Sequence, residues 1–274
     1  MSETTFGSYF ETNKTQEYTL FIHVSPDGFS FSVVNTDEKR LLVYNSTPLK
    51  ISNETFLARR FNEWAKSEKL FQNEFKKTII IFDTEKFTIV PEDYYDCDLK
   101  PKIINLLFET TGKIEIETTK IDELNAELLF CVPSELKDAF KQHFKNFELI
   151  HPVKTLTENL PDSSKKFRLV TYFNKRCFYA LLFNEVNLLL SNSFTVLHEN
   201  DTVFYILSLL KQMKVPKQEV DLFVAGNITI GSKLYTDLQK YIQPIQVLKH
   251  KKPLQADEGV FREIGINSFP FLSC

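Results

Sequence analysis

Short apolar runs separated by polar turns recur along the chain and predict strands joined by tight connections. Residues 18–35 read YTLFIHVSPDGFSFSVVN, residues 167–184 read FRLVTYFNKRCFYALLFN, and the two segments align without a gap. Each pattern predicts a strand, a polar turn, and a second strand that begins with Phe and ends with Asn. A third apolar run follows in each copy, at 41–46 and 188–193, and both runs end in Asn-Ser. The sequence therefore predicts an internal duplication, with a three-stranded meander opening each copy.

The parallel between the copies extends past the meanders. An amphipathic helix is expected after each one, capped by Asn53 in the first copy and by Asn200 or Asp201 in the second. Nearly continuous apolar runs follow at 78–83 and 220–226. Such runs are typical of strands that are covered on both faces, as in parallel pairing.

A second helix is expected after each buried strand, at 93–109 and at 232–242, and a strand near 245–249 completes the second copy. The first copy carries an extra α/β section at about 112–151. The order β-β-β-α-β-α-β thus occurs twice. It predicts an α/β fold in which each copy is a mixed sheet with helices on its faces.

A polar segment at 156–166, LTENLPDSSKK, separates the two copies. We therefore expect a first domain over residues 1–155 and a second over 167–274, with this segment as the linker. The tail from Val260 to Cys274 is rich in apolar residues. We expect it to pack on the second domain, with docking to a partner as the alternative.

Composition narrows the class of protein. The 274 residues are 43% hydrophobic and 25% charged, with a formal net charge of −3. This balance is typical of a globular chain, and it excludes binding to nucleic acid through bulk positive charge. Only 7 glycines are present, which leaves little material for glycine-rich phosphate loops, whereas 26 phenylalanines are explained by core packing.

The cysteine spacing and the first residues indicate whether to expect a metal site and in which compartment to expect the protein. The four cysteines are scattered without C-x-x-C spacing: Cys97, Cys131, Cys177 and Cys274. We interpret them as reduced thiols and expect no metal site. The first residues do not read as a secretory signal, and no apolar run is long enough to cross a membrane. We expect a cytoplasmic protein.

The element order resembles the ribonuclease-H-like unit, and its duplication resembles the actin-like ATPase architecture. More narrowly, FIHVSPDGFSFSVVN at 21–35, FTIVPEDYY at 87–95 and LFVAGNI at 222–228 are similar to the domain-of-unknown-function family 3822, which is typical of Bacteroidota. The resemblance covers nearly the whole chain. It implies two ribonuclease-H-like repeats in an actin-like arrangement, and the family has no assigned activity that could be transferred.

The resemblance also identifies where nucleotide motifs would lie. Active members of the actin-like group typically end the first strand of each repeat in Asp-x-Gly, whereas His23 and Ser25 occupy those positions here. Asp27-Gly28 lies further along, where Ser-Pro-Asp-Gly is typical of a type I turn. The second copy's turn, 174–177, has neither glycine nor acid, and Ala225-Gly226-Asn227 replaces the usual adjacent glycines. The resemblance thus implies a fold that has lost nucleotide hydrolysis.

Five residues are the candidates for binding in a cleft between the repeats: Asp27, Gly28, Lys175, Arg176 and Gly226. If the two first turns face each other, Lys175 and Arg176 can donate hydrogen bonds to a phosphate or another anion. The alternative is that the two basic residues form an ordinary solvated hairpin tip. We expect no cofactor, with ATP and magnesium as the alternative.

Other chemistries are weakly supported. Gly226 to Lys233 nearly matches a P-loop, but its lysine comes one place late, so we interpret it as a strand-to-helix connection with Gly231 or Ser232 near the N-cap. Asp83 is the one well-placed acid for a nuclease, and one carboxylate does not hold two magnesium ions. His23 lies in an apolar strand, where we expect a core histidine with a satisfied hydrogen bond.

These patterns favour a non-catalytic binding or scaffold protein, with a protein partner of unknown identity. The alternatives are a divergent nucleotide-binding protein or weak ATPase that uses the cleft, and an enzyme with an unrecognised site. We expect neither a membrane nor a nucleic acid as partner. The basic run at 248–253 is interpreted as a solvated face, with contact to an acidic partner or RNA as the alternative.

Overall fold

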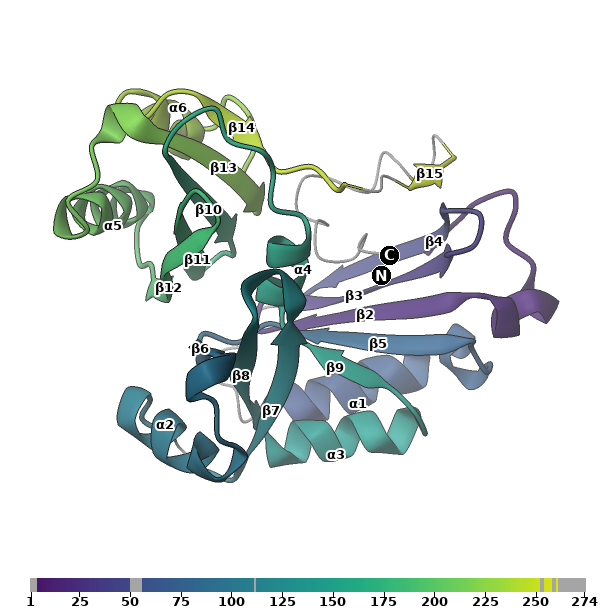
Figure 1. Cartoon of the computed structure of the whole chain (residues 1–274). Helices are drawn as coiled ribbons and strands as arrows, with labels where there is room; N and C mark the ends of the chain where they lie inside the picture. Colours follow the sequence, from purple (N-terminus) through teal and green to yellow (C-terminus); the bar gives the residue numbers. More distant parts are fainter. Residues whose placement is uncertain (1–3, 50–55, 111, 252–253, 258–259, 261–274) are drawn as a thin grey trace.

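The computed structural model describes residues 4–49, 56–110, 112–251, 254–257 and 260. Two mixed sheets and a smaller antiparallel sheet form its framework (Figure 1). Short 3-10 helices connect several elements, at Thr12–Glu17, Lys69–Gln72, Glu92–Tyr94, Cys97–Leu99, Asp122–Leu124 and Lys217–Glu219. Among the described residues, no helix combines the length and the apolar character that crossing a membrane requires.

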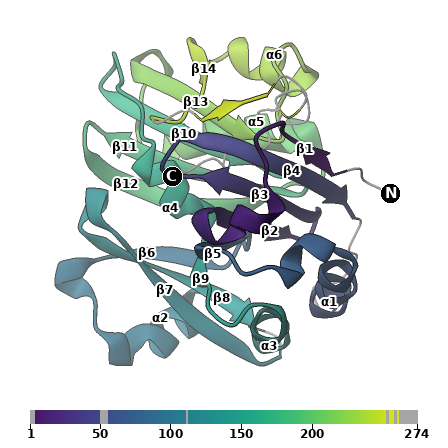
Figure 2. The ribbon, with the colours of Figure 1, turned by 90° about the vertical axis from the view of Figure 1, so that its right-hand side faces the viewer.

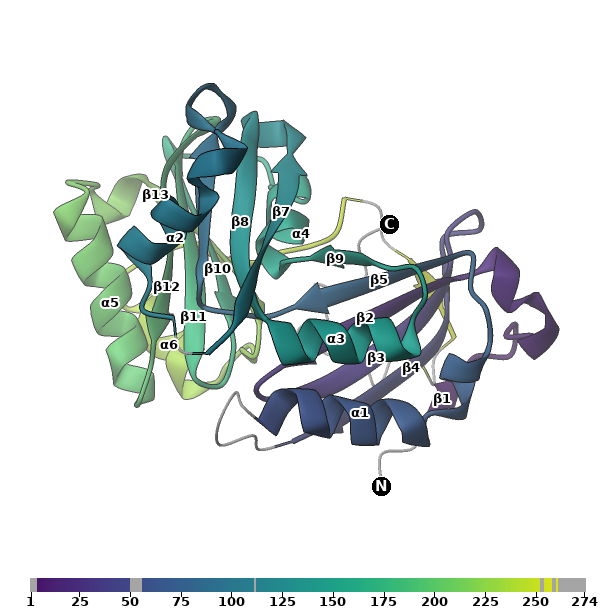
Figure 3. The same cartoon turned by 90° about the horizontal axis from the view of Figure 1, so that it is seen from below.

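The first sheet is built around the N-terminal meander. Its strands are, in spatial order, β1 (Thr5–Phe6), β4 (Arg40–Pro48), β3 (Gly28–Asn35), β2 (Thr19–Ser25), β5 (Lys77–Phe82) and β9 (Glu148–Ile150). β2, β3 and β4 are antiparallel, whereas β5 runs parallel to β2, and β9 parallel to β5. Helices α1 (Leu57–Ser67) and α3 (Ser134–His143) lie together on one face of this sheet (Figure 3).

The second sheet repeats the same plan. Its strands are, in spatial order, β12 (Asn187–Thr195), β11 (Cys177–Asn184), β10 (Phe167–Phe173), β13 (Val220–Gly226) and β14 (Ile245–Val247). The meander of β10, β11 and β12 is again antiparallel, whereas β13 runs parallel to β10, and β14 parallel to β13. Helix α5 (Glu199–Gln212) precedes β13, and α6 (Lys233–Gln239) precedes β14. The N-cap of α5 is His198, not Asn200 or Asp201 as expected; Asp201 is the third helical residue, and its carboxylate accepts from the backbone N–H of His198.

The duplication extends to an irregularity in the pairing. The register between β3 and β4 shifts at Val33/Val34, and that between β11 and β12 shifts at Leu182/Phe183. These positions coincide when the two sequence repeats are aligned. A β-bulge increases local twist and bends the strand, so both meanders curve at the same place. The predicted order β-β-β-α-β-α-β is present in both copies.

The extra section of the first copy lies earlier than the sequence indicated. β9 pairs with β5, so α3 and β9 are the last helix and strand of the first repeat and not part of an insertion at 112–151. The insertion is a separate three-stranded sheet with one helix, comprising β6 (Phe87–Pro91), α2 (Lys100–Leu107), β7 (Ile114–Ile121) and β8 (Ala126–Pro133). The helix expected at 93–109 therefore belongs to the insertion. Apolar periodicity predicts an amphipathic helix but not which sheet it covers.

One apolar core joins the two main sheets. Phe61 on α1 packs against Phe140 on α3, with ring centroids 4.9 Å apart. The same cluster continues through Phe130 of the inserted sheet to Val170 and Tyr179 of the second sheet. Because burial of apolar surface drives packing, the two repeats are held against each other over a shared interior.

The C-terminal region returns to the first sheet. Strand β15 (Gln255–Ala256) pairs in parallel with β4, and Val260 is fully buried beside Phe21 and Ile81. Val260, the described part of the tail, therefore packs on the first sheet and not on the second domain as expected. The rest of the tail, 261–274, and the predicted cap Asn53 lie outside the described residues. The predicted linker 156–166 begins within helix α4 (Pro152–Glu158) and is irregular thereafter.

Candidate functional site

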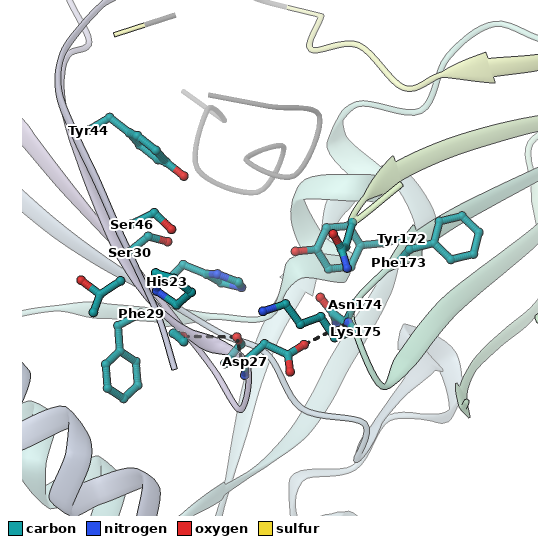
Figure 4. Close-up of a pocket in the computed structure, with 15 residues that line it drawn as sticks. His23, Asp27, Phe29, Ser30, Tyr44, Ser46, Tyr172, Phe173, Asn174 and Lys175 are labelled. Carbon is teal, nitrogen blue, oxygen red and sulfur yellow. Dashed lines mark hydrogen bonds between the residues drawn. The ribbon is translucent and has the colours of Figure 1, made fainter. Parts of the chain in front are cut away.

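The turns that open the two repeats face each other and make direct contact. The carboxylate of Asp27, between β2 and β3, accepts a hydrogen bond from the backbone N–H of Lys175 at 2.9 Å (Figure 4). The guanidinium of Arg176 lies 3.9 Å from the other carboxylate oxygen. Ser25 fixes the Asp27 turn, because its hydroxyl accepts from the Asp27 N–H and donates to the Gly28 carbonyl. The two hairpin tips are thus joined by the acid of one and the backbone of the other.

A pocket of about 240 Å³ lies beside this contact. Three of the five candidate residues line this pocket: Asp27, Gly28 and Lys175. Arg176 and Gly226 do not line it. The remaining walls are rich in hydroxyl and amide groups: Ser25, Ser30, Tyr44, Ser46, Thr47, Asn174 and Asn227. In Figure 4 the Lys175 side chain extends toward His23 across the pocket. The cavity is smaller than the range of roughly 300–1,000 Å³ that is typical of ligand sites.

The two candidate glycines are required by chain packing. Gly28 has φ +143°, and a Cβ at this position would lie 2.5 Å from the Thr47 carbonyl oxygen. Gly226 has φ +83°, and a Cβ there would overlap the Phe173 carbonyl oxygen. Both glycines therefore let neighbouring strands approach each other, and the space freed by the missing side chains is already filled by backbone.

Asp83 is the buried centre of the interface between the repeats. It follows β5 directly, its side chain is 1% exposed, and one carboxylate oxygen accepts from the hydroxyl of Tyr179 and from the amide of Asn174, the latter at 3.1 Å. The other oxygen lies 3.3 Å from Nε2 of His23. The acid considered for nuclease chemistry is thus occupied by partners from the second repeat. His23 is buried and contacts Asp83, as predicted for a core histidine in an apolar strand.

An aromatic and imidazole layer surrounds this carboxylate. Tyr179 also donates to the Thr84 carbonyl at 3.1 Å, and Nε2 of His151 contacts the same carbonyl at 2.9 Å. Nδ1 of His151 accepts from the backbone N–H of Val153, which requires the neutral ring. Burial lowers the pKa of His151 to about 4. Burial, reinforced by the nearby Asp83 charge, raises the pKa of Tyr179 well above its usual value.

A second attachment holds the inserted sheet to the second repeat. The Ser193 hydroxyl donates to the Glu85 carbonyl at 2.8 Å, and the Thr195 hydroxyl donates to the Glu85 carboxylate at 2.6 Å. Glu85 precedes β6, and both partners lie on β12. These bonds join one end of β6 to one end of β12.

Two further features of the sequence, the near-miss P-loop and the cysteines, have ordinary structural explanations. Ser232 is the N-cap of α6 and accepts from Tyr235 N–H, so the near-miss P-loop is the strand-to-helix connection that was predicted. Cys97, Cys131 and Cys177 are free thiols, and Cys274 lies outside the described residues. Burial raises the pKa of Cys131 to about 11 and that of Cys177 still further, which leaves both as neutral thiols.

Sequence reasoning missed several residues of the interface. Asn174 and Tyr179 belong to the hairpin of β10 and β11 and His151 precedes α4, and their partners become visible only in the folded structure. One local signal was available, since Ser30 and Ser32 alternate with phenylalanine and valine on a strand that is otherwise apolar. It also missed one cluster of ligand-type side chains, Asp96, Cys97 and Asp98, on an exposed turn in which Asp96 accepts from Asp98 N–H.

The residues present do not fit a magnesium-bound nucleotide between the hairpins. Asp27 and Asp83 already accept hydrogen bonds from the facing repeat. Gly28 and Gly226 are explained by strand packing, because a Cβ at either position would overlap the backbone of a neighbouring strand. A metal-bound triphosphate needs carboxylates that are free to organise the metal and backbone N–H groups that are open to phosphate.

Comparisons with known proteins agree with this architecture. The family described as "Protein of unknown function (DUF3822)" matches residues 7–245. A Bacteroides thetaiotaomicron protein with an actin-like ATPase fold and unknown function is similar over 97% of this chain and 100% of its own, with a TM-score of 0.80 and 16% identity. A chain of the PilM–PilN type IV pilus biogenesis complex is similar over 93% of this chain and 96% of its own, with a TM-score of 0.56 and 12% identity. No curated protein matches the chain. The fold is therefore that of the actin-like ATPases, as the element order implied.

Proposed function

We propose that this chain, which belongs to the DUF3822 family of proteins of unknown function, is a non-catalytic binding module that keeps the actin-like fold without nucleotide hydrolysis. The observation that carries the proposal is the contact between the hairpins. Asp27 accepts from Lys175 N–H at 2.9 Å, at the place where a nucleotide-binding relative would hold phosphate. The proposal is further supported by Asp83, whose carboxylate is buried and engaged by Tyr179 and Asn174.

The shared core supports a rigid rather than a hinged molecule. Hydrolysis in a two-lobed enzyme requires the lobes to open for substrate and close around it. Here one apolar cluster runs from Phe61 through Phe130 to Tyr179, so opening the lobes would expose buried apolar surface. A rigid body with defined grooves suits recognition of a partner. The similar fold in the PilM–PilN complex indicates that this architecture can serve within an assembly.

One observation favours the alternative, a divergent nucleotide-binding protein. The Lys175 side chain lines the pocket, and within the described part of the chain its ammonium group forms no ion pair. An ammonium group in a polar pocket attracts phosphate. Both proposals therefore make opposite predictions for one experiment.

The test is thermal unfolding with ATP or ADP, each with magnesium and with EDTA. A ligand that binds only the folded state stabilises it by about 2.7 kcal/mol when its concentration is a hundredfold above Kd. We expect no change in Tm with any of the four mixtures, and no phosphate release from ATP. A rise in Tm with ATP that depends on magnesium would contradict the proposal and support the alternative. Inorganic phosphate, tested in parallel, distinguishes recognition of a bare anion from recognition of a nucleotide.

A further inference from the structure

A groove separates the inserted sheet from the second sheet, on the same side as the Glu85 attachment. It has a volume of about 560 Å³ and shares no lining residue with the pocket between the hairpins. One wall consists of β6 and the turn between β7 and β8, and the other consists of the turn between β11 and β12 and the first part of β12. Figures 1 and 2 both show β12 beside the inserted sheet.

Both strands that border the groove are the last strands of their sheets. β6 ends the order β6-β8-β7, and β12 ends the order β12-β11-β10-β13-β14. An edge strand presents a row of backbone N–H and C=O groups to any further strand. The groove is therefore flanked by two edges that can accept an added strand.

The pairing pattern shows which backbone groups of β12 face outward. Val196 N–H donates to the Arg176 carbonyl, and Ser191 stands opposite Leu181 in the same ladder. In an antiparallel ladder, alternate residues direct both backbone groups toward the partner strand. From Val196 back to Leu190, before the register shift, the even-numbered residues bond to β11, so Ser191 directs its N–H and C=O away from it.

The same argument applies to β6. Cys131 N–H donates to the Lys86 carbonyl and Glu92 N–H donates to the Asn125 carbonyl, so even-numbered residues of β6 bond to β8. Ile89 then directs its backbone groups toward the groove. Pro91, also at an outward position, lacks an N–H and suits an edge. Of the two edges, β12 is the better template, because Ser191 offers a backbone N–H where Pro91 on β6 offers none; the N–H of Ser193, the next outward residue, already donates to the side-chain oxygen of Asn192 at 2.9 Å.

The walls between these edges carry partly exposed apolar side chains among polar groups. Val186 is 76% exposed and Leu189 is 40% exposed, and both line the groove together with Leu124 and Ile89. The hydroxyl of Ser191 is covered, and among the residues that the structure describes it has no hydrogen-bond partner. Exposed apolar side chains that gather at one place indicate a surface that is completed by another molecule.

Charge identifies the kind of molecule. Asp122 and Glu123 lie on the rim of the groove and are exposed, and within the described part of the chain neither forms an ion pair. The rim therefore attracts cationic groups and repels nucleic acid. Successive side chains of a strand point to opposite sides. A strand with alternating apolar and basic residues would therefore place apolar side chains against the walls and basic side chains near the acidic rim.

We propose that this groove binds an extended segment of another protein, with alternating apolar and basic residues, which is added as a strand to the free edge of β12. The proposal rests on the function proposed above, a binding module, and assigns its docking surface and the chemistry of its partner. The hydrogen bonds of Ser193 and Thr195 to Glu85 hold the two walls in place before binding. Preorganisation of this kind reduces the entropic cost of association.

The test uses two fluorescently labelled peptides, each with blocked ends and the same alternating pattern of valines. One carries lysines at the polar positions and the other carries glutamates. Fluorescence anisotropy with the full chain is expected to give binding of the lysine peptide that is at least about tenfold tighter than that of the glutamate peptide, through complementarity with the rim. Equal affinities, or no binding of the lysine peptide, would overturn the proposal.

Three variants locate the binding. Val186→Lys places a charge in the wall, the double change Asp122→Lys and Glu123→Lys reverses the rim, and Ser191→Pro removes an outward N–H without removing a bond to β11. Each variant is expected to bind the lysine peptide about tenfold more weakly or worse, while its melting temperature stays close to that of the unaltered chain. Ile230→Lys is the matched control, since Ile230 is also an exposed apolar residue, at 61%, and lies outside the groove.

Two further outcomes decide against the proposal. If Ile230→Lys reduces the affinity for the lysine peptide as much as Val186→Lys does, the peptide binds elsewhere on the chain. If light scattering shows a dimer that Val186→Lys converts to a monomer, the occupant is a second copy of this chain. Neither outcome bears on the nucleotide titration, so failure of the groove and failure of the proposed function are distinguished.

Discussion

The hydroxyl of Tyr179, on a strand of the second sheet, donates a hydrogen bond to the carboxylate of Asp83, which follows a strand of the first sheet and lies 96 positions away in the chain. Both side chains are almost completely buried. A buried carboxylate is stable only when its oxygens are satisfied, so the second repeat is needed to complete the first. The interface between the repeats therefore has a polar centre within an apolar core, and this centre fixes how the repeats are oriented.

We predict that Tyr179→Phe lowers the free energy of unfolding by about 1–3 kcal/mol. The change removes the donor to Asp83 and to the Thr84 carbonyl and leaves buried acceptors with fewer partners. Urea unfolding monitored by circular dichroism gives the free energy directly. The matched control is Tyr172→Phe, because Tyr172 is equally buried and stacks on Tyr179, with ring centroids 5.8 Å apart.

The control is expected to change stability by less than about 0.5 kcal/mol, since within the described part of the chain the Tyr172 hydroxyl forms no hydrogen bond. Equal losses for the two variants would mean that the hydroxyl of Tyr179 contributes nothing specific and that ring packing alone orients the repeats.

Gly226→Ala is predicted to be strongly destabilising, by about 3 kcal/mol or more. The residue has φ +83°, and the added methyl group would overlap the Phe173 carbonyl oxygen, so β13 and β10 would have to separate. Gly231→Ala is the control, because Gly231 has φ +82° and no atom within 4 Å of the added Cβ. Its cost is expected to be about 1 kcal/mol, from backbone strain alone. Chemical denaturation of both variants measures the difference, and similar losses would show that packing at Gly226 is unimportant.

The buried imidazole of His151 makes the fold sensitive to acid. Burial lowers its folded-state pKa to about 4, against 6.5 in an exposed histidine. Between pH 6.5 and 4 the unfolded chain therefore binds a proton that the folded chain does not. Stability falls as pH falls through this range, by about 3 kcal/mol in total from this group. His151→Asn keeps an acceptor for Val153 N–H and removes the titration.

The measurement for His151 is the free energy of unfolding of both proteins from pH 7.5 to 4. The unaltered chain is expected to lose more stability than the variant over this range, so that the difference between them narrows or reverses in acid. Parallel pH profiles would contradict the assignment, as would an NMR titration of His151 with a midpoint near 6.5.

Asp27→Ala is predicted to loosen the contact between the hairpins with a small effect on global stability, about 1 kcal/mol or less. The change removes the acceptor of Lys175 N–H, so the exchange of that amide with deuterium is expected to accelerate several-fold or more. Asp37→Ala is the control, since it removes an exposed acid that pairs with Lys76 on the surface. An unchanged Lys175 exchange rate in Asp27→Ala would show that the hairpins are held by other contacts.

Much of the fold could be predicted from local pattern. The alignment of 18–35 with 167–184 predicted two meanders, and the structure pairs β2 with β3 and β10 with β11 over those residues. Alternation and turn residues act over a few positions, so they are readable without knowledge of the rest of the chain. Ser232 as a helix cap was predictable for the same reason.

The boundaries of the insertion were not predictable in this way. An amphipathic pattern at 93–109 and another at α3 each predict a helix, but the pairing of β9 with β5 decides which one completes the first repeat. The same holds for β15 and Val260, which join the first sheet although they follow the second in sequence. Which sheet an element joins depends on nonlocal burial that a local pattern does not encode.

By itself the sequence determined the two repeated units, their strand order and the absence of the usual acid and glycine at the ends of their first strands, because each of these is written in neighbouring residues. Only the tertiary structure decided what replaces them. Asp83 meets Tyr179 and Asn174, Asp27 meets Lys175, and β6 comes to lie beside β12. These contacts join segments distant in the chain, and they form because a shared core brings the two repeats together and buried polar groups must then find partners.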